Sequence, residues 1–221
     1  MAAVHIFLIR HGETALNAAG VLRGQLDVPL NETGEAEALA LGGVFREVPL
    51  SAVVSSPLRR AVETARPIAT ASGAPLTIDE RLSDRFYGEV AGHSLAQVER
   101  RFGSIDAAPL VEAWQLLESR AEEVFLEVAA SFDAAPPPPR AAARGTARTG
   151  AGGQVAGPAG SAALVTHDAV IRALLRLLVP VLDSVKLELP TGSWSEVVAQ
   201  SPAGQWRAAR LGELPVNASR P

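Results

Sequence analysis

Residues 4–10 read VHIFLIR, an apolar run that ends on an arginine and leads directly into His11. A strand that is apolar on both faces is typical of a parallel sheet covered by helices on each side. Shorter runs of the same kind lie at residues 52–55, 75–78 and 162–166. Stretches with apolar residues at helical spacing separate these runs, and the alternation predicts an α/β fold.

The helices are expected where apolar residues recur every three to four positions. Thr33 is expected to cap the first long helix, and Ser56 with Pro57 to open the next one. The clearest pattern gathers apolar residues on one face of the segment 111–132. The other predicted helices cover residues 33–47, 94–102 and 169–179. Three late strands are predicted at residues 186–189, 194–200 and 205–211.

The composition is that of a folded protein, since 48% of the 221 residues are hydrophobic and 20% are charged. A wholly disordered chain is therefore excluded. Proline, glycine, alanine and arginine dominate from about residue 133 to 161, with four consecutive prolines at 136–139. We interpret this segment as a flexible insertion within a single domain over residues 1–221, because a buried-strand pattern resumes after it.

The charge and the cysteine count exclude several classes of protein. Twenty basic and 24 acidic residues give a net charge of −4, which argues against nucleic acid or an anionic membrane as partner. The absence of cysteine removes disulfides, thiolate zinc sites and a cysteine nucleophile. No apolar run reaches the roughly 18 residues that span a bilayer, and residues 2–9 lack a basic leader. We expect a cytoplasmic protein.

Polar side chains follow three of the predicted strands. The first strand ends in Arg10 and His11, the second leads to Arg60, and a later one ends in His167 and Asp168. In an open α/β sheet, ligands bind beyond the carboxyl ends of the strands, so these residues are expected to converge. Because guanidinium groups match phosphate oxygens in a bidentate way, the sequence predicts a phosphate site.

The same residue types favour phosphoryl transfer. A neutral imidazole can attack phosphorus and hold the group as phosphohistidine, and fixed cations stabilise the charge of the transferred group. A carboxyl group must then protonate the leaving alkoxide and later accept a proton from water. Asp84 and Asp168 are both candidates for this acid.

Five segments in order along the chain resemble signatures of the histidine phosphatase superfamily, in the branch that contains cofactor-dependent phosphoglycerate mutase and related phosphatases. They are LIRHGET at residues 8–14 with Asn17, GQLDVPL at 24–30, SSPLRRAVETA at 55–65, RLSDRFYG at 81–88 and VTH at 165–167. Five matches in family order are far more specific than any one of them. The resemblance covers most of the chain outside the insertion.

The resemblance implies a three-layer α/β/α fold with a mostly parallel central sheet, similar to phosphoglycerate mutase. It implies a phosphohistidine intermediate that forms without a metal or a cofactor. By position, His11 resembles the nucleophile and His167 the second histidine, while Arg10 and Arg60 resemble the phosphate clamps. Three further positions match substrate-facing residues of the family: Asn17, Arg23 and Gly24.

The chain departs from the family pattern at the residue expected to donate the proton. Asp84 stands where relatives commonly have glutamate, and aspartate is one carbon shorter, with about 1.5 Å less reach. Asp168 stands where glycine is common, and other branches of the superfamily use an aspartate there as proton donor. We favour Asp84 as the donor. Asp168 stays open as an alternative donor, as a substrate-binding residue and as the cap of the following helix.

A second departure favours hydrolysis over isomerisation. Mutases of the family carry a Gly-Leu-Asn-Lys run after the loop that matches residues 81–88 here, which we call the acid loop because it contains Asp84. This chain instead reads GHSL at residues 92–95, and its single lysine is Lys186. The sequence therefore predicts a metal-independent phosphomonoesterase acting on a small phosphorylated metabolite. A mutase-type isomerase and a phosphate-binding protein with weak or lost catalysis remain as alternatives.

Overall fold

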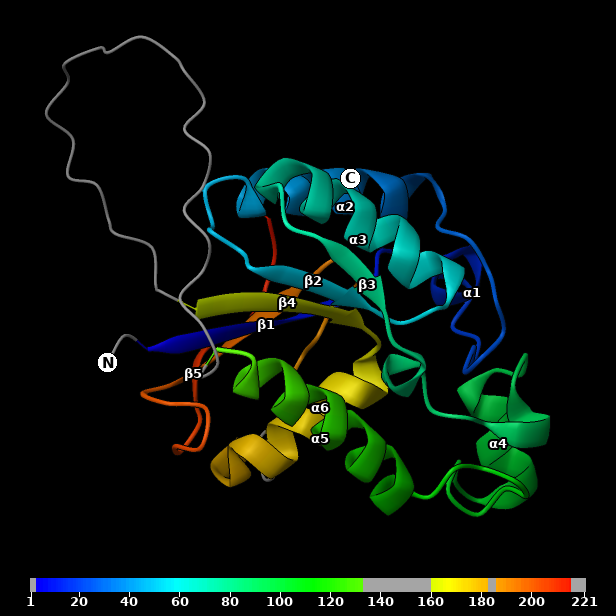
Figure 1. The fold of residues 1–221 in the computed structure, drawn as a ribbon. Coiled ribbons are helices and arrows are strands. Elements are labelled where there is room, and N and C mark those ends of the chain that lie inside the picture. The colour runs from blue at the N-terminus through cyan, green and yellow to red at the C-terminus, as the bar shows by residue number, and fades with distance from the viewer. Residues whose placement is uncertain (1–2, 133–159, 183–185, 216–221) are drawn as a thin grey trace, which may run out of the picture.

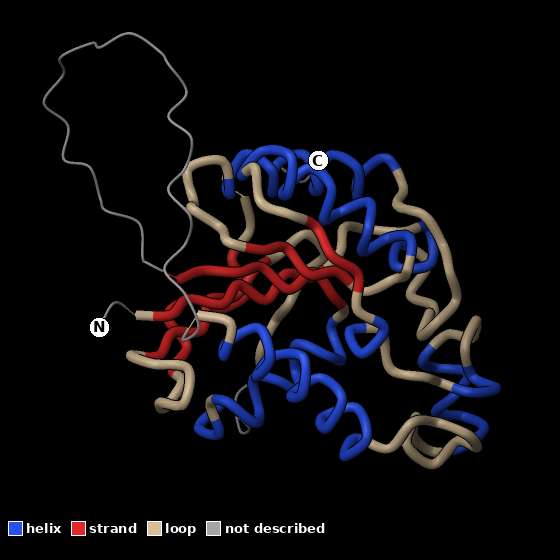
Figure 2. Tube along the Cα trace, in the orientation of Figure 1, coloured by secondary structure: helices blue, strands red, loops and turns tan. Residues whose placement is uncertain are grey.

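The structure is a computed structural model that describes residues 3–132, 160–182 and 186–215. A six-stranded sheet of order β3-β2-β4-β1-β5-β6 runs through the molecule, and helices cover both of its faces (Figures 1 and 2). The predicted three-layer α/β/α fold is confirmed. Apart from residues 160 and 161, which belong to a strand, the predicted insertion lies outside the described residues.

The sheet is mostly parallel, as predicted, and only β5 runs opposite to the other described strands. β1 (Val4–Arg10) pairs in parallel with β4 (Gly160–Thr166). On the far side of β4 lie β2 (Ala52–Ser55) and then β3 (Leu76–Ile78). On the other side of β1 lies β5 (Trp194–Ala199), which is antiparallel to β1 and also to its outer neighbour β6 (Arg207–Glu213).

The long helices form two layers that bury alternate residues of the same strands. They are α2 (Glu32–Phe45) and α3 (Arg59–Ser72) on one face of the sheet, and α5 (Trp114–Ala130) and α6 (Asp168–Leu178) on the other (Figure 1).

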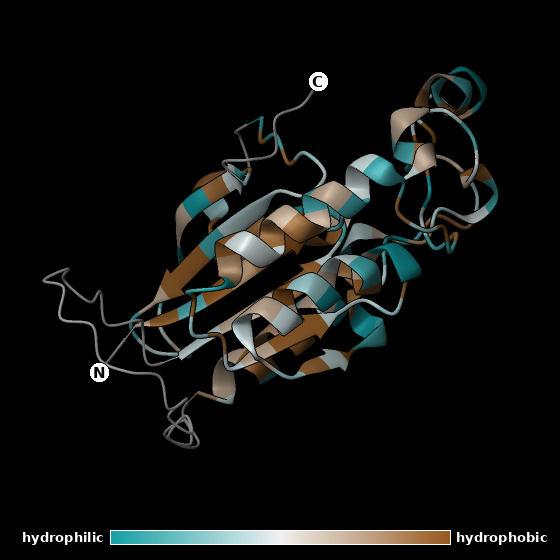
Figure 3. Ribbon diagram, turned by 90° about the horizontal axis from the view of Figure 1, so that it is seen from above, coloured by the Kyte–Doolittle hydropathy of each residue, from teal (hydrophilic) through white to brown (hydrophobic). Residues whose placement is uncertain are grey.

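Within β1, Phe7 and Ile9 pack in the core beneath α2 and α3, whereas Ile6 and Leu8 pack against α5 and α6. This alternation is the two-residue period of a strand with both faces buried. Figure 3, which views the molecule from above, shows the apolar strands beneath α2 and α3.

A small lobe lies beyond the carboxyl ends of the parallel strands (Figures 1 and 3). It contains α4 (Leu95–Phe102) and the 3₁₀ turn η2 (Gly88–Val90), and Val90, Val98 and Ala108 form its separate apolar core. The remaining short elements are α1 (Ala15–Ala18), η1 (Glu80–Leu82) and η3 (Pro180–Leu182). Within the part of the chain described, no helix is long and apolar enough to cross a membrane.

Two predicted helix starts are wrong by a few residues. The cap of α2 is Asn31 instead of Thr33, because the Asn31 side chain accepts a hydrogen bond from the backbone N–H of Gly34 at 2.9 Å. The helix after Ser56 begins only at Arg59 and has no side-chain cap. The Ser56 hydroxyl instead lies 2.8 Å from a buried histidine ring.

Two other predicted elements also need correction. Residues 186–189 form no strand; this irregular segment passes beneath Arg10, which donates to the carbonyl oxygen of Leu189. The helix predicted over 111–132 is limited to α5, because the backbone of Glu112 bonds instead to Phe86 and to the Arg85 side chain.

Candidate active site

The ends of β1 and β4 place two histidines opposite each other. His11 directly follows β1 and His167 directly follows β4, and the two strands are neighbours in the sheet. The ring centroids are 5.1 Å apart, and both side chains are fully buried. The convergence expected from the sequence is therefore present at the carboxyl edge of the sheet.

The tautomer of His11 is set by its own loop. Its Nδ1 lies 2.6 Å from the carbonyl oxygen of Gly12, which can only accept, so Nδ1 carries the proton. The other nitrogen, Nε2, accepts a hydrogen bond from Nε of Arg60 at 3.2 Å. Burial, and then the positive charges of Arg60 and Arg10, hold the pKa of His11 well below its usual value. The ring is thus neutral, with a lone pair on Nε2.

Arg60 is a fully buried guanidinium held from several sides. It donates to the carbonyl oxygens of Gly24 at 2.7 Å and Leu26 at 2.8 Å, and to Oδ2 of Asp84 at 3.2 Å. These contacts fix the plane of the cation beside His11. A fixed cation at this position can stabilise charge on a transferred group without reorganising.

His167 presents a buried ring nitrogen without a hydrogen-bond partner. Its Nε2 lies 2.8 Å from Oγ of Ser56, a hydroxyl that can accept from the ring or donate to it. Its Nδ1 has no partner among the described residues, and it carries the proton of the neutral ring when Ser56 donates to Nε2. Burial first, and Arg60 second, hold the pKa of His167 well below its usual value.

Asp84 is the acid that the structure brings to the histidines. Its side chain is 5% exposed, and Oδ2 lies 3.9 Å from Nδ1 of His167. Oδ1 accepts from the backbone N–H of Arg85 at 2.9 Å. Burial raises the pKa of Asp84, and the attraction of Arg60 opposes that rise only in part. The carboxyl group therefore holds its proton more readily than an exposed aspartate does.

Asp168, the second candidate acid, has cationic partners instead. It is the first residue of α6, and its carboxylate accepts from Arg172 at 2.8 and 3.2 Å. It also lies 3.6 Å from Arg10, whose pKa burial lowers. Its side chain is 32% exposed. This carboxylate supports Arg10 and the first turn of α6, and His167, rather than Asp168, occupies the cap position.

The loop after α1 supplies Arg23 and Gly24. Arg23 lowers the pKa of both histidines, which places its charge near them, and its buried Nε has no acceptor within the described part of the chain. Gly24 adopts a φ of 50°, and a Cβ there would lie 3.0 Å from the carbonyl oxygen of Arg85. Glycine therefore lets this loop pass close to the acid loop.

Asn17 is engaged in a helix cap. Its amide oxygen accepts from the backbone N–H and the hydroxyl of Thr14 at 3.1 and 2.8 Å. Arg59, next to Arg60 in sequence, pairs with Glu63 on the exposed side of α3. Besides the two histidines, the structure brings Arg10, Arg23, Gly24, Arg60 and Asp84 to this edge of the sheet, ties Asp168 to Arg10 and places Asn17 in the cap of α1.

Sequence reasoning missed several residues that hold the site. Ser56 was interpreted as a helix cap but bonds to His167, and its position after a strand was the available signal. Thr64 accepts from the backbone N–H of Gly12 at 3.0 Å and thereby ties α3 to the His11 loop. Arg120, on α5, bonds to the backbone of the acid loop, and no sequence pattern marked it.

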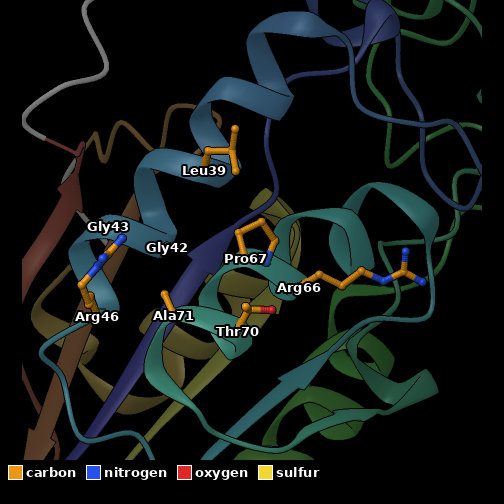
Figure 4. A pocket seen from close by; sticks show the side chains of 8 residues that line it. All are labelled: Leu39, Gly42, Gly43, Arg46, Arg66, Pro67, Thr70 and Ala71. Carbon is orange, nitrogen blue, oxygen red and sulfur yellow. The ribbon is translucent and has the colours of Figure 1, made fainter. Parts of the chain in front are cut away.

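Outside this site, a groove lies between α2 and α3 (Figure 4). Gly42 lets the two helices approach, since a Cβ there would lie 3.0 Å from the carbonyl oxygen of Pro67. None of the nine predicted site residues lines this groove. Among the described residues, no group of three or more histidine and acidic side chains is arranged to hold a metal ion.

The mixed sheet flanked by helices is the fold of the phosphoglycerate-mutase-like histidine phosphatases. The native structure of a mycobacterial glucosyl-3-phosphoglycerate phosphatase superposes with a TM-score of 0.76 at 25% identity, covering 95% of this chain and 99% of that one. A phosphoglycerate mutase from Bacillus anthracis gives a TM-score of 0.75 at 21% identity, over 96% and 94% of the two chains.

The chain belongs to the histidine phosphatase superfamily (branch 1), whose family model matches residues 6–135. A glucosyl-3-phosphoglycerate phosphatase from Mycolicibacterium vanbaalenii is 36% identical over 94 residues, which is 42% of each chain. A 2,3-bisphosphoglycerate-dependent phosphoglycerate mutase from Gloeobacter violaceus is 36% identical over 101 residues, or 44% of this chain and 46% of that protein. The aligned stretches span less than half of these curated relatives.

Proposed function

We propose that this protein is a phosphomonoesterase that transfers a phosphoryl group from a small phosphorylated metabolite to His11 and then to water. One observation carries the proposal: in the described structure, Nε of Arg10 and Nε of Arg23 are buried donors without an acceptor, and Nδ1 of His167 is a buried ring nitrogen without a partner. Each such donor costs about 1–3 kcal/mol. A phosphoryl group with three anionic oxygens, placed against Nε2 of His11, would supply the acceptors.

The first half of the reaction forms the phosphoenzyme. The lone pair on Nε2 of His11 attacks phosphorus while the bond from phosphorus to the ester oxygen breaks. The guanidinium groups of Arg10, Arg23 and Arg60 stabilise the charge on the phosphoryl oxygens. Asp84 donates its proton to the departing alkoxide, and the raised pKa of this buried carboxyl favours the protonated form that the step requires.

The second half releases inorganic phosphate. The carboxylate of Asp84 accepts a proton from water, and the resulting hydroxide attacks phosphorus while the bond to Nε2 of His11 breaks. His11 returns to its neutral form, which its lowered pKa favours. Asp84 is again protonated, so the cycle is closed without a further reactant.

The substrate class follows from the relatives. They include a phosphatase named for glucosyl-3-phosphoglycerate and mutases named for phosphoglycerate. We infer a phosphorylated sugar acid or a similarly small phosphorylated metabolite. Hydrolysis is favoured over isomerisation because the single lysine, Lys186, is exposed in the segment before β5 and is far in sequence from the acid loop.

The test is a single-turnover experiment with a panel of small phosphate esters and p-nitrophenyl phosphate. Acid-labile, alkali-stable phosphate should appear on His11, and His11→Ala should lower kcat by about a thousandfold or more. His93→Ala, which changes an exposed loop histidine, is the matched control and should keep full activity.

Three outcomes would contradict this proposal. A His11→Ala protein with normal turnover would exclude the phosphohistidine. Interconversion of phosphoglycerates without release of free phosphate would identify a mutase, the activity named for the Gloeobacter relative. Tight binding of phosphate or vanadate without any turnover would identify a phosphate-binding protein.

A further inference from the structure

The backbone that carries Asp84 is bonded to one side chain of α5. Arg120 donates through one terminal nitrogen to the carbonyl oxygens of Arg81 at 2.6 Å and Ser83 at 2.7 Å. Its other terminal nitrogen donates to the carbonyl oxygen of Asp84 at 3.1 Å. A single guanidinium thus fixes three carbonyl groups within four consecutive residues of the acid loop.

Arg120 is itself held by Glu112, the residue two positions before α5. Its Nε and second terminal nitrogen donate to the two carboxylate oxygens of Glu112 at 2.8 and 2.9 Å. Burial acts to raise the pKa of Glu112, but the bonds from Arg120 and from the backbone N–H of Phe86 outweigh it and leave the pKa lowered. Both side chains are mostly buried, at 20% and 14% exposure. The bidentate pair fixes the plane of the guanidinium.

We infer that Arg120, oriented by Glu112, is a positioning residue that holds the Asp84 carboxyl at the distance at which it exchanges a proton with the substrate. This inference rests on the proposed function. It adds the side chain, Arg120, that positions the proton donor Asp84. The shorter aspartate side chain gives the loop backbone more control over where the carboxyl lies than a longer glutamate would. A displacement of about 1 Å at such a group can cost up to about a hundredfold in rate.

A neighbouring ion pair provides a matched control. Arg81 also ties the acid loop to α5, through Glu127 at 2.8 and 2.6 Å. Glu127 is 65% exposed and bonds to no backbone group of residues 83–85. Glu127→Gln therefore weakens the link between the same two elements without touching the carbonyl groups that Arg120 fixes, and it is expected to leave activity unchanged.

The experiment compares a good and a poor leaving group. We would measure kcat/KM for p-nitrophenyl phosphate and phenyl phosphate with the full chain and with Arg120→Gln, Arg120→Lys and Glu127→Gln. Phenolate, the poorer leaving group, must be protonated as its bond to phosphorus breaks, whereas p-nitrophenolate can leave without a proton. Arg120→Gln should therefore lower kcat/KM about tenfold or more for phenyl phosphate and about threefold or less for p-nitrophenyl phosphate. Arg120→Lys should lie between these values and the wild type.

A second measurement separates positioning from general support of the fold. In an Asp84→Ala background, Arg120→Gln should leave the ratio of the two kcat/KM values unchanged, since the group that it positions is absent. Equal losses on both substrates, or a change in the ratio that persists without Asp84, would overturn the inference. If thermal denaturation shows that Arg120→Gln does not fold, Arg120→Lys carries the same comparison.

Failure of the inference is distinguishable from failure of the proposed function. No phosphate release and no phosphohistidine in the wild type would reject the function itself. An active wild type whose ratio does not respond to Asp84→Ala would reject Asp84 as donor and the inference with it. An active, Asp84-dependent wild type with no response to Arg120→Gln would reject the role of Arg120 alone.

Discussion

His11 and His167 are neutral in the folded protein because burial penalises the imidazolium form and nearby guanidinium groups repel it. The burial that keeps both rings neutral also lowers the stability of the folded protein at acid pH. The neutral rings leave a lone pair on Nε2 of His11 and a nitrogen without a hydrogen-bond partner, Nδ1, on His167. In the unfolded chain, each ring takes up a proton near pH 6.5, so acid favours unfolding.

The two buried histidines should therefore destabilise the protein from about pH 6.5 downward, whereas Asp84, whose pKa burial raises, acts in the opposite direction. A histidine whose pKa is lowered on folding binds fewer protons in the folded state, so stability falls as pH falls through the unfolded value toward the folded one. Each of the two histidines contributes a slope of up to about 1.4 kcal/mol per pH unit. Urea unfolding between pH 7.5 and about pH 5.5 measures this slope.

Substitutions assign that slope to the site. Each of His11→Gln and His167→Gln removes one titrating group, so each should reduce the slope of unfolding free energy against pH by up to about 1.4 kcal/mol per pH unit. His93→Gln, at an exposed loop position, should leave the slope unchanged. Unfolding free energies that fall equally steeply in all four proteins would show that neither site histidine is the cause.

At the scale of elements, the His11 loop is seated directly on the first turn of α2. A Cβ at Gly34 would lie 2.1 Å from the carbonyl oxygen of Glu13, and one at Gly12 would lie 2.5 Å from the carbonyl oxygen of Gly34. The backbone N–H of Glu13 also donates to Glu37, further along α2, at 2.8 Å. The helix therefore fixes the position of the His11 loop, because backbone atoms cannot yield as side-chain ends can.

Gly34→Ala tests this packing with a control on the same helix. The added methyl group must push the His11 loop away from α2, which we expect to cost about 1–3 kcal/mol of stability and to lower kcat. At Gly43, nothing lies within 4 Å of an added Cβ, so Gly43→Ala should stabilise by about 0.5–1 kcal/mol without affecting kcat. Thermal unfolding and turnover of p-nitrophenyl phosphate measure both effects. Equal stabilities of the two variants would contradict the close approach.

For the whole molecule, stability is expected to be uneven. The sheet is buried by helices on both faces, whereas the lobe with α4 has its own small apolar core beside the site (Figure 1). A segment with little buried apolar surface opens at lower free energy than the core strands do. Among the described residues, the lobe is thus expected to open more readily than the sheet.

Hydrogen exchange at native conditions should resolve this difference. Amides of β1 and β4 should exchange only through global unfolding, while those of α4 should exchange through a local opening of lower free energy. Val98→Ala, in the core of the lobe, should speed exchange in α4 and leave β4 unchanged. Identical opening free energies in α4 and β4 would show that the molecule unfolds as one unit.

Short stretches of sequence were sufficient to predict much of the fold. The continuous apolar runs predicted β1, β2 and β4 to within two residues because a strand buried on both faces needs apolar side chains at every position. The carboxyl-edge rule then predicted that His11 and His167 would meet, although 156 positions separate them in the sequence, because their strands are parallel neighbours.

The sequence alone determined the α/β class, the strands β1, β2 and β4 and the identity of the imidazole and guanidinium groups, because each depends on residue type and short-range periodicity. Only the tertiary structure decided which carboxyl faces the histidines, how Ser56 orients His167 and that Arg120 binds the acid loop. These contacts depend on where side chains from separate helices and loops end in space. Whether such a contact forms depends on burial and on distances of a few ångströms, and no local sequence pattern encodes either quantity.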